Sequence, residues 1–147
     1  MMKTIFGLCL ISFLLAGCLP ADVMTKLGLL QSSQSTQPSI DEALLEEGRA
    51  SYLHNYCGSC HQLTAANTRG TFGPSHDHIG TIAAERVTTE GYTGTATTAE
   101  GYLRESLLDP LVYSAPGYEA TNHHMPAYTH LPDEEIDALV YFLLHQE

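Results

Sequence analysis

The feature that most constrains this chain is the pentapeptide Cys57-Gly58-Ser59-Cys60-His61. Two thiols separated by two residues can add to the two vinyl groups of one haem, and the adjacent histidine then places an imidazole against the iron. A covalently held haem is large and apolar, so it can serve as part of a protein core. The pentapeptide therefore predicts a chain folded around one haem c.

Other interpretations of the cysteine pair remain open at this point. A thioredoxin-like C-x-x-C needs a βαβ setting, and no strand pattern surrounds this one. A zinc site needs a second ligand pair at a suitable spacing, whereas His76 and His78 are two residues apart and His123 and His124 are adjacent. A structural disulfide is geometrically possible, but it would leave His61 without a role.

Two long segments are rich in Gly, Thr and Pro and show no alternation typical of strands: residues 68–80, TRGTFGPSHDHIG, and residues 88–98, TTEGYTGTATT. Loops of this length are uncommon in a compact domain. They indicate that something other than protein fills the middle of the domain, which agrees with a haem.

Helical patterns lie on either side of these segments. Ser39 and Glu42 form a capping box, and the apolar stripe that follows predicts a helix running directly into Cys57. Gly48 falls within this stripe. Because a glycine inside a helix costs about 1 kcal/mol relative to alanine, we expect it to mark a close contact with another helix.

Two more helices are predicted towards the C-terminus. Thr97 and Glu100 form a second capping box before a helix over 99–108, which the following Asp-Pro step ends. The last helix should begin near Pro132, where three acidic residues favour its N-terminus, and its apolar stripe continues to Leu144. The chain is therefore predicted to be all-α.

The N-terminal segment has the pattern of an exported lipoprotein. Lys3 precedes an apolar stretch over residues 5–15, which fits a secretory signal. The stretch ends in Leu15-Ala16-Gly17-Cys18, which resembles the lipobox of bacterial lipoproteins, in which cleavage precedes the cysteine that carries the lipids. The alternative is an ordinary signal peptide with a chance cysteine.

These patterns predict three parts: a signal peptide over 1–17, a lipidated Cys18 with a flexible tether over 18–38, and one domain over 39–147. Loss of the signal removes Cys9, so only Cys57 and Cys60 are left for the folded domain. We expect the protein on the extracytoplasmic (periplasmic) side of a bacterial membrane, held there by its lipid anchor.

The chain is strongly acidic, with 17 Asp and Glu against 6 Lys and Arg and a net charge of −11. Such a chain is a poor nucleic-acid binder, because it would repel the phosphates. It suits a protein partner with a basic docking face.

From about residue 41 to 147 the chain resembles the class I monohaem cytochromes c, the mitochondrial-cytochrome-c-like class. The resemblance rests on Gly48 and Tyr52 in the first helix and on the segments CGSCH, Phe72-Gly73-Pro74, YLRESLLDP, GYEATNHHMP and LPDEEIDALVYFLL. It implies a cytochrome c-like fold, in which three to five short helices and long loops surround one covalent haem c.

The resemblance also implies roles for single residues. Gly48 should meet Phe142 or Tyr141 where the first and last helices cross. The carbonyl of Pro74 should orient the imidazole of His61, the proximal iron ligand.

The second axial ligand should come from the loop before the last helix, which contains TNHHMPAYTH over residues 121–130. Its candidates are His123, His124, Met125 and His130, and three histidines elsewhere in the chain rank behind them: His76, His78 and His54. The resemblance selects Met125, followed by a proline that would stiffen the loop, and places His124 next. His/Met ligation would raise the reduction potential relative to two histidines.

A haem closed on both faces has no open substrate site, so we expect one-electron transfer to redox partner proteins rather than catalysis. The stretch over residues 102–126 is similar to cytochrome c domains of haem-copper oxidases and to monohaem subunits of alternative complex III. The resemblance thus implies a subunit of a quinol-oxidising or terminal-oxidase complex in a respiratory or photosynthetic chain. Alternatives are a free tethered shuttle, the haem subunit of a periplasmic redox enzyme, and a haem sensor.

Overall fold

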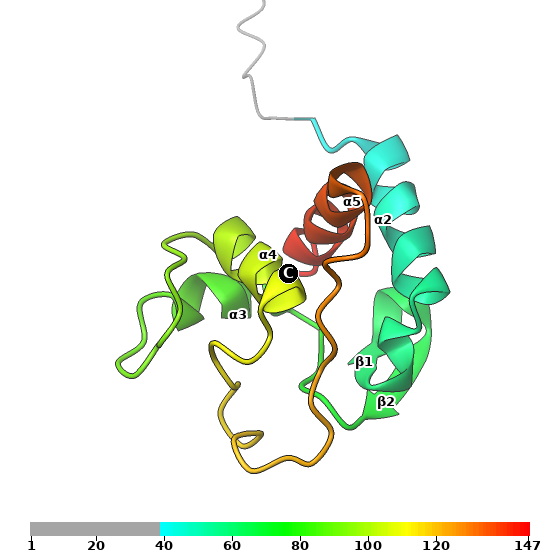
Figure 1. Cartoon of the computed structure of the whole chain (residues 1–147). Coiled ribbons are helices and arrows are strands. Elements are labelled where there is room, and N and C mark those ends of the chain that lie inside the picture. Colours follow the sequence, from blue (N-terminus) through cyan, green and yellow to red (C-terminus); the bar gives the residue numbers. More distant parts are fainter. Residues whose placement is uncertain (1–38) are drawn as a thin grey trace, which may run out of the picture. The chain divides into compact units, whose positions relative to one another are not determined.

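The computed structural model describes residues 39–147. The predicted signal peptide, the lipidated Cys18 and the tether lie outside the described residues. Within 39–147 the chain is mostly helical, with a short hairpin (Figure 1). Its elements are α2 (Glu42–His54), the 3₁₀ turn η1 (Cys57–Ser59), β1 (His61–Leu63), the 3₁₀ turn η2 (Thr64–Ala66), β2 (Thr68–Thr71), α3 (Ile79–Arg86), α4 (Ala99–Leu108) and α5 (Asp133–Leu144).

The first and last helices, α2 and α5, lie side by side (Figure 1). Their closest approach is at Gly48. A Cβ at Gly48 would lie 2.0 Å from the carbonyl oxygen of Ala138 and 2.6 Å from Cβ of Phe142, so only glycine allows this approach. Next to the crossing, the ring of Tyr52 meets the ring of Phe142 edge-on at 5.8 Å. Of the two aromatic residues proposed from the sequence, Phe142 is the one at Gly48.

Helices α3 and α4 pack against each other and against α5. They bury Ile79, Ala83, Tyr102, Leu103 and Leu107 in one core with the inner face of α5. The hairpin of β1 and β2 follows α2 and η1 on the other side of the domain (Figure 1). Between α4 and α5 the chain makes a long excursion without regular structure over residues 109–132. None of the helices within residues 39–147 is long and apolar enough to span a membrane.

The helix caps differ from the sequence-based predictions. Helix α2 begins at Glu42, and its N-cap is Asp41 rather than Ser39, because the Asp41 carboxylate accepts from the amides of residues 43 and 44 at 3.1 Å. Helix α4 spans the predicted 99–108, but Thr98 rather than Thr97 caps it, with Oγ1 accepting from the amide of Gly101 at 3.0 Å. In each case the cap lies one or two residues closer to the helix than the residue predicted from the sequence.

Two further predictions were wrong. Helix α2 does not run into Cys57: it ends at His54, and Tyr56 adopts a left-handed conformation with φ of 57° that turns the chain. The stretch over 68–80 is not all loop, because it contains β2 and the start of α3. A four-residue strand and an eight-residue helix without a side-chain cap give little periodic signal.

Candidate functional site

A cavity of about 420 Å³ lies between the hairpin side of the domain, α4 and the segment that follows α4. This volume falls in the usual range for ligand sites. Most of its lining is apolar or aromatic, and among the described residues that line it Arg86 alone carries a full charge at neutral pH. Its lining includes Cys57, Cys60, His61, Pro74, His76, Leu103, Leu107, Tyr118, His123, His124, Met125 and Tyr128.

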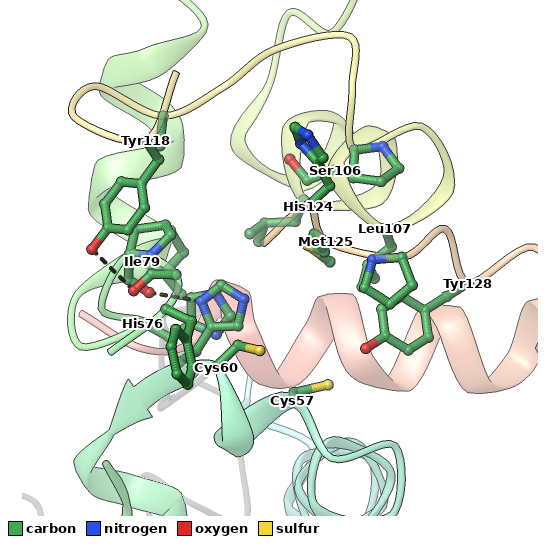
Figure 2. A pocket seen from close by; sticks show the side chains of 18 of the residues that line it. Cys57, Cys60, His76, Ile79, Ser106, Leu107, Tyr118, His124, Met125 and Tyr128 are labelled. Carbon is green, nitrogen blue, oxygen red and sulfur yellow. Dashed lines mark hydrogen bonds between the residues drawn. The ribbon is translucent and has the colours of Figure 1, made fainter. Parts of the chain in front are cut away.

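Cys57 and Cys60 form one wall of the cavity. The turn η1 brings them together, since the amide of Cys60 donates to the carbonyl of Cys57 at 3.2 Å. Figure 2 shows both sulfurs directed into the open space. The two cysteines are close along the chain and face the same cavity, as attachment of one haem requires.

The same geometry weighs against the other interpretations of the pair. Burial raises the pKa of Cys57 to about 11, whereas a thioredoxin-like redox cysteine needs a lowered pKa. Both thiols are free, and no disulfide joins them. Within residues 39–147 no group of three or more His, Cys, Asp or Glu side chains could hold a metal ion in the manner of a zinc site.

His61 begins strand β1, and its side chain is buried, with 7% of the residue exposed. Its Nδ1 lies 2.7 Å from the carbonyl oxygen of Pro74, so the Nδ1–H donates there and the lone pair is on Nε2. Burial lowers the pKa of His61, although the Pro74 carbonyl opposes this effect. A neutral imidazole held at one nitrogen by a carbonyl is the usual arrangement of a metal-ligating histidine.

Gly73 holds the segment before Pro74 against His61. Its amide donates to the carbonyl of Cys60 at 2.9 Å. A Cβ at Gly73 would lie 2.4 Å from Cε1 of His61, so a larger residue would displace the ring. Its carbonyl accepts from the hydroxyl of Tyr118 at 3.0 Å, which ties this segment to the chain after α4 (Figure 2).

Met125 and His124 lie across the cavity from the two sulfurs (Figure 2). Met125 is half-buried and packs against the core, whereas His123 and His124 are exposed. The ring of His123 instead rests on Phe72, with centroids 4.6 Å apart. Met125 is therefore the candidate that contacts the interior.

The structure does not bring every histidine of the sequence to the cavity. His130 is exposed and is not part of the cavity lining, and the same holds for His54 and His78. His76 does line the cavity, although the sequence-based ranking placed it behind the others. Its ring stacks on the ring of His61, with centroids 3.8 Å apart and planes 14° apart.

Sequence reasoning missed three more residues of the cavity: Arg86, Tyr118 and Tyr128. Arg86 points its guanidinium to the hydroxyl of Tyr102 at 2.7 Å. Tyr128 is buried, and its amide donates to the carbonyl of Leu107 at 2.8 Å, which fixes the chain just after Met125. Each of these contacts joins residues at least sixteen positions apart, and no local pattern in the sequence marks them.

The residues present fit a covalent haem c. Two thiols share one wall, a buried neutral imidazole is fixed beside them, and a thioether lies across an apolar cavity. Among the described residues of the lining, Arg86 alone is an arginine or lysine, and its positive charge suits the two carboxylates that a haem carries. No acidic side chain of the described residues lines the cavity, so nothing there repels those carboxylates.

A protein-family model described as cytochrome c matches residues 45–147. The matched range extends from the fourth residue of α2 to the end of the chain and includes every cavity residue named above. No curated protein and no solved structure matches the chain.

Proposed function

Since the chain belongs to the cytochrome c family, we propose that it is a lipid-anchored, monohaem member that works in a membrane electron-transport chain. The family carries covalently attached haem c and transfers electrons, so the predicted cofactor and the general role of the chain are confirmed. The mostly helical structure also confirms the predicted cytochrome c-like fold. Cytochrome c domains typically lie on the extracytoplasmic side.

In this proposal Cys57 and Cys60 would hold the haem through thioethers, and His61 and Met125 would ligate its iron. When bound, the haem supplies a one-electron couple, and the protein contributes ligation, burial and exclusion of water. The observation that carries the proposal is the 2.7 Å contact between Nδ1 of His61 and the carbonyl of Pro74, beside the two thiols. It leaves Nε2 available and keeps the ring from turning away.

We prefer Met125 to His124 as the second iron ligand because the side chain of Met125 is more buried. The Met125 side chain packs against the core, whereas His124 would have to leave solvent and pay for its desolvation. A thioether ligand opposite an imidazole raises the reduction potential relative to two histidines. We therefore expect a potential at the high end for a c-type cytochrome.

The mouth of the cavity supports contact with another protein. Three exposed apolar side chains line it: Tyr56, Phe72 and Leu111, with 79%, 53% and 68% of each residue exposed. No Asp, Glu or Lys of the described residues joins them, although the chain as a whole carries a charge of −11. These features fit a redox partner whose contact surface is apolar at its centre and basic around it. The negative charge of the chain would attract the basic residues at long range, and the apolar residues would then make the close contact.

The finer part of the proposal is that Cys18 carries lipid and that the domain serves as a subunit of a quinol-oxidising or terminal-oxidase complex. The Leu15-Ala16-Gly17-Cys18 segment supports the anchor. Extraction of membranes with mild detergent, followed by sizing, tests the assignment. We expect the haem to migrate at the mass of a large complex, and migration at monomer mass would favour a free tethered shuttle. Replacement of Cys18 by serine should abolish labelling of the chain with a fatty-acid probe, whether or not the domain is bound to a complex.

A pyridine haemochrome assay tests the function itself. The wild-type chain, expressed with its export signal, should give the spectrum of a haem bound through two thioethers. The C57A/C60A double variant should lose the covalent haem, while C9S, which changes a cysteine of the predicted signal, should keep it. Wild-type protein that carries no covalent haem would overturn the proposal, and rapid carbon monoxide binding by the reduced form would favour a haem sensor instead.

A further inference from the structure

A second imidazole lies directly against His61. The rings of His61 and His76 are nearly parallel, 14° apart, with their centroids separated by 3.8 Å. This is van der Waals contact over a whole ring face, so His61 cannot turn about its Cβ–Cγ bond without displacing His76. The motif C-x-x-C-H does not require a partner of this kind.

His76 is itself held in place from two sides. Its amide donates to the carbonyl of Gln62 at 2.8 Å. Its Nδ1 lies 3.2 Å from the hydroxyl of Tyr52, which is fully buried at the crossing of α2 and α5. One hydrogen bond therefore joins the two side chains, and the tautomer of His76 determines which of them donates. A continuous series of contacts thus runs from the helix crossing through Tyr52 and His76 to His61.

The Pro74 carbonyl alone leaves the ring of His61 some freedom. A histidine χ2 torsion is broad, and one hydrogen bond directs Nδ1 without fixing the tilt of the ring plane. The stacked ring of His76 adds a second restraint on the face of the imidazole. Two apolar side chains at positions 52 and 76 could fill the same volume, and no polar group would then have to be removed from water. The presence of Tyr52 and His76 instead indicates that this pair does more than fill space.

We propose that His76 is a positioning residue that sets the plane of the His61 imidazole. The proposal rests on the assignment of His61 as the proximal ligand. In a ferric haem the plane of the imidazole ligand, together with the orientation of the opposite ligand, affects how unpaired spin spreads over the porphyrin. With the opposite ligand unchanged, a change in the imidazole plane would therefore change the order of the four haem-methyl proton shifts.

The test compares His76→Phe with His76→Leu in the complete ferric holoprotein. Phenylalanine keeps a ring that can stack on His61, whereas leucine keeps apolar volume without a ring. We expect H76F to retain the wild-type order of the four haem-methyl shifts and H76L to change it. The matched control is His54→Leu, an exposed residue at the end of α2 that does not line the cavity and should leave the order unchanged.

Tyr52→Phe provides a second test should H76L fold poorly, because it removes only the hydroxyl that holds Nδ1 of His76. We expect Y52F to change the spacing or temperature dependence of the four shifts. Unchanged shifts in both H76L and Y52F would overturn the proposal, as would equal changes in H76F and H76L. The pyridine haemochrome of each sample reports covalent haem separately, so a failed haem assignment is distinguishable from a failed role of His76.

Discussion

The two walls of the cavity are built in different ways. The proximal wall, residues 57–79, is cross-linked by backbone hydrogen bonds: Gly73 to Cys60 at 2.9 Å and His76 to Gln62 at 2.8 Å. The distal loop, residues 109–132, has no helix or strand, and Leu111 in it is 68% exposed. One wall therefore holds its candidate ligand by paired backbone, and the other presents its candidate ligand on an irregular segment.

This difference indicates that the two walls of the cavity have different roles. A fixed imidazole gives a ligand geometry that changes little between oxidation states, which keeps the reorganisation on electron transfer small. A ligand on a loop can be replaced in evolution or displaced by an added ligand without disturbing the core. The two walls meet at a hydrogen bond from Tyr118 to the Gly73 carbonyl and at the contact of Phe72 with His123.

The largest expected effect comes from breaking the proximal wall. Gly73→Ala places a Cβ 2.4 Å from Cε1 of His61, a ring that the Pro74 carbonyl and His76 prevent from moving away. We expect a loss of about 1–3 kcal/mol in the free energy of unfolding, with altered ligation of the ferric protein. Denaturant unfolding followed by Soret absorption measures both.

The matched control for that variant is Gly101→Ala in α4. A Cβ at Gly101 would have its nearest neighbour at 3.2 Å, the hydroxyl of Thr98, so a small shift accommodates it. Equal destabilisation by the two variants would show that Gly73 has no special relation to His61.

The next effect comes from the distal loop. Met125→Leu keeps apolar volume at a half-buried position, so we expect a packing cost below about 1.5 kcal/mol. The thioether is lost, however, and the reduction potential should fall while the ferric iron becomes high-spin or takes a water. A redox titration with a spin-state measurement checks this. His124→Leu, at the neighbouring exposed position, should leave the reduction potential almost unchanged. A large fall of the potential in this variant would indicate that His124, and not Met125, is the iron ligand.

A smaller effect is expected where the walls meet. Tyr118→Phe removes the neutral hydrogen bond to Gly73, worth about 1 kcal/mol. If this bond helps to keep the distal loop closed, added imidazole should displace the sixth ligand with about fivefold higher apparent affinity. Spectrophotometric titration measures the change. Tyr141→Phe, which loses a hydroxyl contact to the amide of Asp41 outside the cavity, should leave this affinity unaltered.

The smallest effect is a pH dependence of the proximal wall. The amide of Thr64 and the side chain of Gln62 donate to the Asp77 carboxylate at 2.7 and 2.9 Å and lower its pKa. Because the folded-state pKa lies below the unfolded one, the stabilisation is present above the unfolded value of about 4 and is lost as pH falls through the folded value. Asp77→Asn should flatten this acid dependence in unfolding curves. An unaltered slope in D77N would assign the acid sensitivity to other carboxylates.

Local patterns predicted the parts of the fold that carry strong periodicity or fixed spacing. The 99–108 helix and the start of the last helix near Pro132 agree with α4 and α5. The crossing at Gly48 followed from the resemblance and from the cost of a helix glycine. Short elements such as α3 and the hairpin were missed, because their stability comes from the helices and turns they pack against rather than from their own sequence.

The same distinction applies to the residues of the cavity: some could be predicted from local sequence patterns and others could not. The pentapeptide CGSCH indicated three of its residues at once, because the chemistry needs them adjacent in the chain. The contacts of His76 with Tyr52 and of Tyr118 with Gly73 span 24 and 45 positions. Such pairs depend on the path of the whole backbone, and a single sequence gives no signal for them.

The most direct test of the account is the near-infrared absorption of the oxidised holoprotein, where a weak charge-transfer band reports a methionine sulfur bound to ferric iron. We expect this band in the wild-type protein and in the H123A/H124A double variant. It should disappear in Met125→His. Absence of the band in the wild-type protein, or its persistence in M125H, would contradict the pairing of His61 on the fixed wall with Met125 on the loop.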